Sequence, residues 1–350
     1  MSSKHRERVF KALEHKKPDR VPVDEPPGWR EDILKQLLAY LNASDVEEVR
    51  KILGIDFRLV SAKFKYEPWQ KDPSKTINEW GMVFEPTSTG LHVRFFVHPL
   101  ANASTAKEIW EYPFPELSSE RFEEAEKQTR MWKSKYVVSA MMEATLFEHA
   151  WYLRGFQNFL MDLISRPNMA NALLDKLLKY KIEMTGYFLD MGVDIIRLGD
   201  DVGWQRGMIL SPAIWRKYFK PRMSTLISYI RKHSSDVVYI FYHSDGYIMP
   251  IIPDLIEIGV QILNPVQPEC MDPVEIKRLY GDKLTLHGTI GVQSILPFGT
   301  PDDVRQEVIK RIKECGLNGG LIIAPSHTPQ PGTPIENIVA MYRAATSYKL

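Results

Sequence analysis

The sequence predicts an α/β protein whose parallel strands close into a (β/α)8 TIM-type barrel. Apolar runs typical of buried strands recur along the chain, starting near residues 136, 194, 237, 261, 284 and 320. Helical stretches such as 167–189 and 301–315 separate them, and this many alternating units favour a closed parallel barrel. No Gly-x-Gly-x-x-Gly turn follows any run, which disfavours an open, doubly wound sheet.

Length and composition fit a single globular domain. The 350 residues exceed the ~250 of a typical barrel, which leaves roughly a hundred for insertions. The chain is 44% hydrophobic and 25% charged, as is ordinary for a protein with a full core. A net charge of +1 gives no field that would recruit nucleic acid. No apolar segment approaches the ~20 residues that span a bilayer, so we expect no membrane association.

The cysteines and the N-terminus predict a cytoplasmic protein. Cys270 and Cys315 are too few for a disulfide framework. Residues 1–8 are polar, whereas a secretion signal carries an apolar region.

The first elements are a short basic helix over residues 4–17, which Pro18 ends, and a brief strand at 21–23 that completes the barrel. Residues 29–53 carry helical periodicity, with Ser44 as a candidate N-cap.

Residues 56–98 break the alternation of strands and helices. Segments 80–84 and 92–97 are strand-like, and the turn signal at 87–90 predicts a β-hairpin. Residues 105–135 are polar and helical again. We therefore expect one domain, 1–350, with 26–135 as a partly inserted cap region over the barrel mouth.

Each apolar run from residue 136 onward ends in polar, titratable side chains. The clearest case is 237–242, which His243, Ser244, Asp245 and Gly246 follow. The residues just past the strands of a barrel line its site, so this pattern indicates an enzyme. The other runs end in Glu143, in Asp200 and Asp201, in Gln267 and Glu269, in His287, and in Ser326 and His327.

Four of these residues form a candidate metal site: His243, Asp245, Glu269 and His327. A catalytic zinc takes three protein ligands of N, S or O type and keeps one position open, and the His-x-Asp spacing lets one loop donate two. The alternative is a hydrogen-bonded histidine pair that orients a polar substrate without metal.

The candidate catalytic residues are Asp200, Asp201, His243 and Glu143. Adjacent carboxylates in one pocket tend to have one pKa raised, which suits a general acid. Alternatively, one aspartate caps the helix that begins near residues 210–212 and the other is solvated. The candidate substrate-binding residues lie in or beside the same loops and include aromatic side chains that could stack on a flat ligand: Trp204, Gln205, Tyr242, Gln267 and His287.

Short motifs over nearly the whole chain resemble the uroporphyrinogen decarboxylase superfamily in order and spacing. They lie at residues 7–10, 18–23, 199–205, 210–212, 288–290, 296–301, 324–327 and 334–338. The resemblance implies a TIM-type barrel, in agreement with the alternation of strands and helices. It also implies one of two broad activities, decarboxylation or corrinoid-dependent methyl transfer.

Two departures from the family's patterns separate these activities. The decarboxylases have an Arg-Gln-Ala-Gly-Arg stretch after the first strand, whereas residues 24–30 here contain one arginine, Arg30. A site rich in carboxylates would also repel a substrate with eight carboxylates. The thiol-specific methyltransferases hold zinc on a His-x-Cys-Gly motif and a distant cysteine, whereas this chain has Asp245 in the motif and His327 near the second position.

The resemblance therefore implies a methyltransferase that takes a methyl group from a methoxylated aromatic compound, an O-demethylation, and passes it to the Co(I) corrinoid of a partner protein. A harder His and carboxylate site suits an oxygen-bearing substrate. It implies zinc in this chain and a monomer or homodimer. The alternatives are a methylcobamide-to-thiol methyltransferase, a uroporphyrinogen-type decarboxylase, and a tetrapyrrole- or corrinoid-binding protein without activity.

Overall fold

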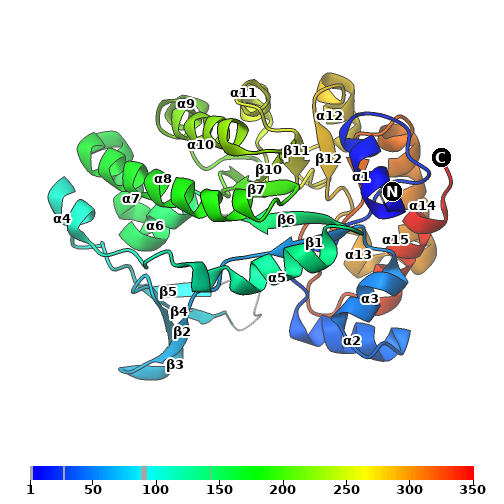
Figure 1. Cartoon of the computed structure of the whole chain (residues 1–350), viewed down its shortest axis with the longest axis horizontal. Coiled ribbons are helices and arrows are strands. Elements are labelled where there is room, and N and C mark those ends of the chain that lie inside the picture. The colour runs from blue at the N-terminus through cyan, green and yellow to red at the C-terminus, as the bar shows by residue number, and fades with distance from the viewer. Residues whose placement is uncertain (1–2, 27, 88–92, 143) are drawn as a thin grey trace.

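A barrel of parallel strands forms the centre of the computed structural model, which describes residues 3–26, 28–87, 93–142 and 144–350 (Figure 1). Seven strands pair side by side in the order β1-β6-β7-β10-β11-β12-β13. Their bounds are Phe57–Val60 (β1), Val137–Met141 (β6), Ile195–Gly199 (β7), Tyr239–His243 (β10), Ile262–Asn264 (β11), Thr285–His287 (β12) and Leu321–Ile322 (β13).

The segment that was expected to be the first strand closes this sheet into a ring. Ile323 N donates to Pro22 O over 2.9 Å, and Asp24 N donates to Ile323 O over 3.0 Å. On the other side, Asp56 N donates to Val23 O over 3.0 Å. Residues 21–24 therefore lie between β13 and β1 and take the eighth position, which confirms the predicted barrel.

Helices surround the barrel and connect its strands (Figure 1). They are α1 (Lys4–Leu13), α2 (Glu31–Leu41), α3 (Val46–Leu53), α4 (Ala106–Glu111), α5 (Glu123–Trp132), α6 (Phe147–Arg154), α7 (Phe156–Ser165), α8 (Pro167–Asp190), α9 (Pro212–Tyr218), α10 (Lys220–His233), α11 (Ile252–Glu257), α12 (Pro273–Tyr280), α13 (Ile295–Phe298), α14 (Pro301–Arg311) and α15 (Ile335–Ser347). The first helix ends four residues before its predicted end. Asp45, rather than Ser44, caps α3 by accepting a hydrogen bond from Glu48 N.

The predicted cap region divides into parts of different kinds. β1 lies inside 26–135 and is a barrel strand, so the barrel extends further toward the N-terminus than residue 136. A separate antiparallel sheet follows, in the order β2 (Tyr66–Trp69), β3 (Asp72–Asn78), β4 (Val83–Pro86) and β5 (Val93–Val97). β4 and β5 pair with Phe84 opposite Phe95, as the predicted hairpin requires, and residues 88–92 of its turn lie outside the described residues.

Helix α1 plugs the barrel at the end where the strands begin. Its buried Val9 and Leu13 join a compact apolar cluster with side chains from the strands: Phe57, Val137, Ile195, Tyr239, Phe241, Ile262 and Ile322. Because this end is filled, ligands can enter the barrel only from the carboxyl ends of the strands.

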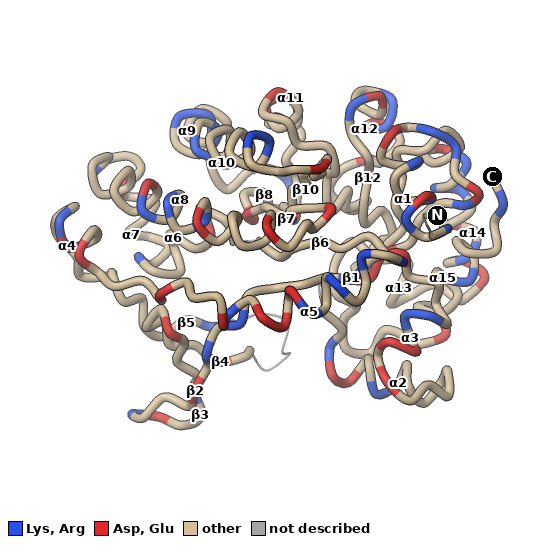
Figure 2. Tube along the Cα trace, in the orientation of Figure 1, with Lys and Arg blue, Asp and Glu red and all other residues tan. Residues whose placement is uncertain are grey.

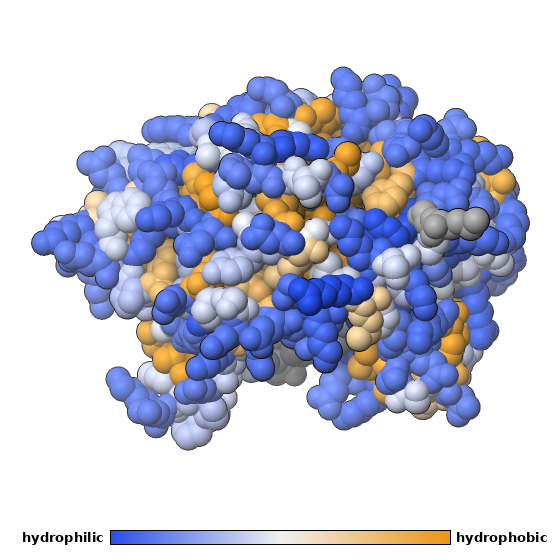
Figure 3. Space-filling model, viewed as in Figure 1, coloured by the Kyte–Doolittle hydropathy of each residue, from blue (hydrophilic) through white to orange (hydrophobic). Residues whose placement is uncertain are grey.

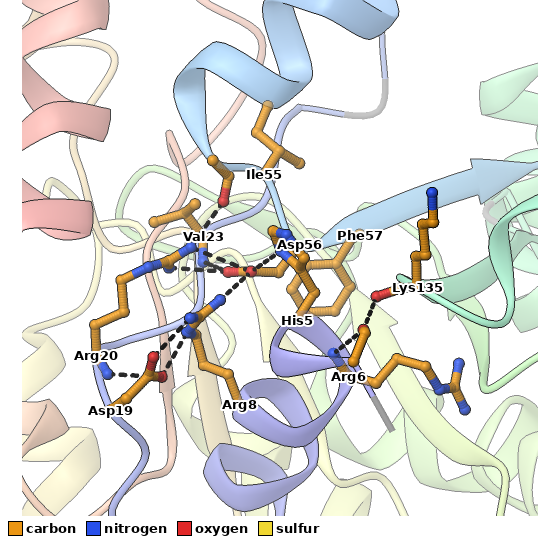
Figure 4. Close-up of polar contacts among 12 residues, drawn as sticks. His5, Arg6, Arg8, Asp19, Arg20, Val23, Ile55, Asp56, Phe57 and Lys135 are labelled. Carbon is orange, nitrogen blue, oxygen red and sulfur yellow. Dashed lines mark hydrogen bonds and ion pairs between the residues drawn. The ribbon is translucent and has the colours of Figure 1, made fainter. Parts of the chain in front are cut away.

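A buried carboxylate, Asp56, ties α1 to the two strands that close the barrel (Figure 4). It accepts hydrogen bonds from His5 and Arg8, near the start of the chain, and from Arg20 and the amide of Val23. Burial alone would raise the pKa of Asp56, but the contacts with His5, Arg20 and Arg8 outweigh it and lower the pKa.

The outer surface carries mixed charge. Lysine and arginine alternate with aspartate and glutamate along the outer helices (Figure 2), and the face shown in Figure 3 is mainly hydrophilic with small hydrophobic areas. In the described part of the chain, none of the helices is both long enough and apolar enough to cross a membrane.

Candidate active site at the barrel mouth

Three titratable side chains meet at the carboxyl ends of β7 and β10: Asp201, His243 and Asp245. One ligand atom from each lies within 4.8 Å of the others. His243 Nε2 is 3.4 Å from Asp201 Oδ1 and 4.0 Å from Asp245 Oδ1. We call these residues the acidic-histidine cluster.

The close approach of β7 and β10 brings the cluster together. Gly199, the last residue of β7, pairs with His243, the last residue of β10. A Cβ on Gly199 would lie 2.3 Å from the His243 carbonyl oxygen, so only glycine fits there. Asp201 follows two residues later, and its Oδ1 accepts a 2.8 Å hydrogen bond from Asp245 N.

A chain of hydrogen-bonded polar side chains orients His243 through its Nδ1, the nitrogen that does not face the two carboxylates. His243 Nδ1 lies 2.6 Å from Asn264 Oδ1, and Asn264 Nδ2 lies 2.7 Å from His287 Nδ1. His287 Nε2 lies 3.0 Å from Asp24 Oδ2, which also pairs with Arg197. An amide oxygen can only accept, so the hydrogen of a neutral His243 lies on Nδ1 and its Nε2 faces the two carboxylates.

The remaining predicted metal ligands take different positions. His327 adjoins the cluster, with Nε2 3.7 Å from Asp245 Oδ2. Glu269 turns toward α13 instead, where Oε1 accepts from Ser294 Oγ at 2.7 Å and from Gln293 N at 3.2 Å. Asp201, predicted only as a catalytic residue, occupies the position beside His243 where Glu269 was expected.

The cluster fits a divalent metal ion of the zinc type. Imidazole nitrogens and carboxylate oxygens both bind zinc, and a catalytic zinc site takes three protein ligands. The second hydrogen bond of His243, to Asn264, is the kind of support that metal-binding histidines have.

Asp200 points away from the cluster and caps helix α6. Its carboxylate accepts hydrogen bonds from Leu146 N at 2.9 Å and from Glu148 N at 3.0 Å. The alternative prediction therefore had the right role but the wrong helix, because Ser211 caps α9, which begins at Pro212. Burial raises the pKa of Asp200 to about 7.

Two residues near Asp200, Glu148 and Lys181, were not predicted from the sequence as part of the site. Glu148 accepts from Asp201 N at 3.0 Å and from Tyr152 Oη at 2.6 Å, and burial with the nearby aspartates raises its pKa to about 8. Burial lowers the pKa of Lys181 to about 8. The signal for Lys181 was a lone lysine on an apolar helix face, four residues after Leu177.

An open cleft of about 500 Å³ lies beside the cluster. It is lined by three of the predicted substrate-binding residues, Trp204, Gln205 and Gln267, together with Asp201, Asp245 and His327. The other two lie deeper. Tyr242 is 1% exposed and packs in the core, and His287 is 3% exposed and belongs to the chain that orients His243. Glu143 lies outside the described residues.

Comparison with known proteins places this fold and site in context. The sequence model of the family described as uroporphyrinogen decarboxylase (URO-D) matches residues 124–348. The methylcobamide:CoM methyltransferase MtaA of Methanosarcina barkeri is 26% identical over 198 residues, which are 56% of this chain and 54% of that protein. A uroporphyrinogen decarboxylase of Coxiella burnetii is 23% identical over 199 residues, 54% of this chain and 50% of that protein.

The chain thus spans about half the length of the curated relatives it matches. A solved structure, a methyltransferase from Methanosarcina mazei, superposes with a TM-score of 0.72 over 99% of both chains, at 18% identity. This likeness supports the barrel fold.

Proposed function

The chain belongs to the uroporphyrinogen decarboxylase (URO-D) family, and we propose that it is a methyltransferase that works with a corrinoid-binding partner protein. The proposed reaction moves the methyl group of a methoxylated aromatic compound to the partner's Co(I). The observation that carries the proposal is the acidic-histidine cluster at the barrel mouth. Two relatives support the reaction class by name, a methylcobamide:CoM methyltransferase and a methylated-thiol–coenzyme M methyltransferase.

The composition of the cluster favours an oxygen-bearing substrate over a thiol. Two carboxylates and an imidazole are harder donors than the thiolates that suit thiol activation. Neither cysteine belongs to the cluster: Cys315 is buried elsewhere, and Cys270 faces Gln205. Burial, together with Glu269 and Asp245, raises the pKa of Cys270 to about 11, so its thiol stays protonated at neutral pH.

The same cleft is poorly suited to a uroporphyrinogen. None of the described residues that line it is a lysine or arginine that could pair with the carboxylates of such a substrate. Arg197, a cation at the base of the mouth, is already paired with Asp24. Arg30, the arginine that follows the first strand, lies 3.1 Å from Asp32.

In the proposed mechanism this chain binds, orients and activates the ether. Asp201, His243 and Asp245 would hold zinc, with His327 beside them. When bound, the zinc supplies a Lewis acid that draws charge from the ether oxygen. The partner's corrinoid would supply the electron pair for the new bond to the methyl carbon, and the pair of the broken C–O bond would stay on the departing phenolate oxygen. A free phenol has a pKa of about 10, so this oxygen then takes a proton from water.

The positioning role falls to the residues below His243. Asn264, His287 and Asp24 fix the imidazole so that Nε2 faces Asp201 and Asp245. Glu148 holds the backbone of Asp201 in place. Asp200 acts indirectly: its carboxylate caps the start of α6, the helix that carries Glu148. Pre-formed geometry of this kind lowers the entropic cost of the reaction.

The direct test is a methyl-transfer assay with the purified zinc-loaded protein, reduced cobalamin and a panel of methoxybenzoates, followed by the absorbance of methylcobalamin. His243→Ala should lower the rate by about 10²-fold or more while the melting temperature stays nearly unchanged. Glu269→Gln is the matched control, because Glu269 faces Ser294 and Gln293 rather than the cluster. Decarboxylation of uroporphyrinogen, with no methylcobalamin from any methoxyarene, would contradict the proposal.

A further inference from the structure

A second cavity, of about 440 Å³, lies between the antiparallel sheet and the barrel mouth. The sheet contributes Phe84 and Phe95 to its walls, helix α6 contributes His149 and Tyr152, and helix α8 contributes Tyr180 and Lys181. We call it the aromatic pocket. Its volume is within the range of sites for small organic ligands.

The walls of the aromatic pocket are flat rings that hold each other in place. Phe95 stacks on Tyr152, with ring centroids 4.7 Å apart and planes at 24°. Trp80 meets Tyr180 edge to face at 4.8 Å and 70°. These rings support one another, and their faces and edges offer stacking contacts to a planar ligand.

Two residues that line the pocket, His149 and Tyr180, carry polar atoms that lack partners among the described residues. His149 is 9% exposed, and neither its Nε2 nor the hydroxyl of Tyr180 has a hydrogen-bond partner there. Lys181 Nζ reaches Met142 O over a long 3.5 Å. Buried polar groups are nearly always paired, so these groups are suited to meet polar atoms of a ligand.

The hydrogen-bonding roles of these groups select the ligand. His149 makes a hydrogen bond with the backbone of Ala144, and since Nε2 has no partner, the bond is made by Nδ1. Burial and the charge of Lys181 lower the pKa of His149 well below its usual value, so the ring is neutral and Nε2 is an acceptor. Lys181 and Tyr180 are donors. A group that both donates and accepts, such as a phenolic hydroxyl, can pair with His149 and with one of the two donors.

We propose that the aromatic pocket is a binding site for a small phenol. The ring lies between the aromatic walls, and the hydroxyl donates to His149 Nε2 and accepts from Lys181 or Tyr180. The site goes beyond the proposed function, because binding requires neither metal nor methyl transfer. The aromatic pocket is a different cavity from the cleft beside the acidic-histidine cluster, which we call the metal cleft. Hydrogen bonds link the two sites: Tyr152 donates to Glu148, which also accepts from the amide of Asp201.

The experiment is calorimetric titration of the metal-free protein with guaiacol (2-methoxyphenol). Two analogues separate the parts of the proposal: 1,2-dimethoxybenzene lacks the hydroxyl, and 2-methoxycyclohexanol lacks the flat ring. Guaiacol should bind about tenfold more tightly than either. Equal affinity for dimethoxybenzene would overturn the role of the hydroxyl, and equal affinity for the cyclohexanol would overturn that of the ring.

Variants locate the site. Tyr180→Phe and His149→Ala should each weaken guaiacol binding by about tenfold. Tyr40→Phe, an exposed tyrosine on α2, is the matched control and should bind as the wild type does. Tyr180→Phe keeps the aromatic ring, so this variant still tests the site if the His149→Ala protein fails to fold. If Tyr180→Phe binds normally while Gln205→Ala does not, the phenol occupies the metal cleft and the proposal is wrong.

The outcomes are distinct from those of the methyl-transfer assay. Guaiacol binding that depends on Tyr180, without methyl transfer from any methoxyarene, would support the aromatic pocket and refute the proposed function. Methyl transfer without guaiacol binding would support the proposed function and refute the phenol site in the aromatic pocket.

Discussion

At the scale of single residues, His243 depends on a neighbour that cannot bind metal well itself. Asn264 sets which nitrogen of His243 carries the hydrogen and where the other one points. Polar partners behind a metal ligand often affect metal affinity almost as strongly as the ligand does.

We therefore predict that Asn264→Ala weakens zinc binding by about 10–100-fold, because the imidazole loses its fixed orientation. Competition with a chromophoric chelator measures the affinity. Glu269→Gln serves as the control and should change it far less, since Glu269 lies outside the cluster. If Glu269→Gln weakens zinc binding more than Asn264→Ala does, Glu269 is a metal ligand, as the sequence analysis expected.

Asp56 gives a prediction about stability and pH. Asp56→Asn leaves buried Arg8 and Arg20 without their shared carboxylate, and we expect a loss of about 3–5 kcal/mol in the free energy of unfolding at pH 7. The folded-state pKa lies below the unfolded value, so the contribution is present above about pH 4 and is lost as the pH falls through the folded pKa.

Urea unfolding at several pH values measures this difference, which should shrink below about pH 4. Asp32→Asn is the control, because Asp32 is 43% exposed and its pair with Arg30 contributes little. Equal stability of the Asp56→Asn and Asp32→Asn variants at pH 7 would show that the buried network adds nothing.

The residues of the site were predictable in part. His243, Asp245 and His327 could be found because each directly follows an apolar run, and the barrel brings such positions to one rim. The orientation of the Glu269 side chain could not be predicted, because its hydrogen-bond partners Ser294 and Gln293 belong to a loop after another strand. Glu148 and Lys181 escaped notice because they lie within helices rather than at strand ends.

At the scale of elements, β1 shows why a strand can be hidden in the sequence. Its four residues include Arg58, whose charge interrupts the apolar pattern that marks a buried strand. The structure buries Arg58 to 1% exposure by pairing it with Glu47 and placing it 3.7 Å from the centre of the Tyr136 ring. Partners distant in sequence therefore decide this element, whereas the uninterrupted apolar run of β10 can be recognised from local pattern alone.

Helix α1 is expected to stabilise the barrel by filling its closed end. Leu13→Ala should cost about 2–5 kcal/mol, because it leaves a cavity in the cluster with Phe57 and Ile322. Lys11→Ala, on the exposed side of the same helix, should change the free energy of unfolding by about 0.5 kcal/mol or less. Chemical denaturation of both variants makes the comparison, and similar losses would argue against a plug.

At the scale of the whole molecule, the antiparallel sheet and the barrel should differ in local stability. Strands β2 and β3 are largely exposed or half-buried, whereas β7 is buried throughout. Amide hydrogen exchange followed by mass spectrometry should therefore be faster in β2–β5 than in β7 and β10. Uniform protection across both sheets would contradict this, and guaiacol should slow exchange in β4 and β5 selectively if it occupies the aromatic pocket.

The way the ring closes has a consequence for how the protein is made. Residues 21–24 are synthesised well before one of their partners, Ile323, which lies 300 residues later. At about 5–20 residues per second, synthesis of that interval takes roughly 15–60 s. During this time Val9, Leu13 and Val23, all buried in the finished barrel, have no complete ring to enter. These apolar side chains therefore lack their final packing until β13 and Ile323 emerge and residues 21–24 can pair with them.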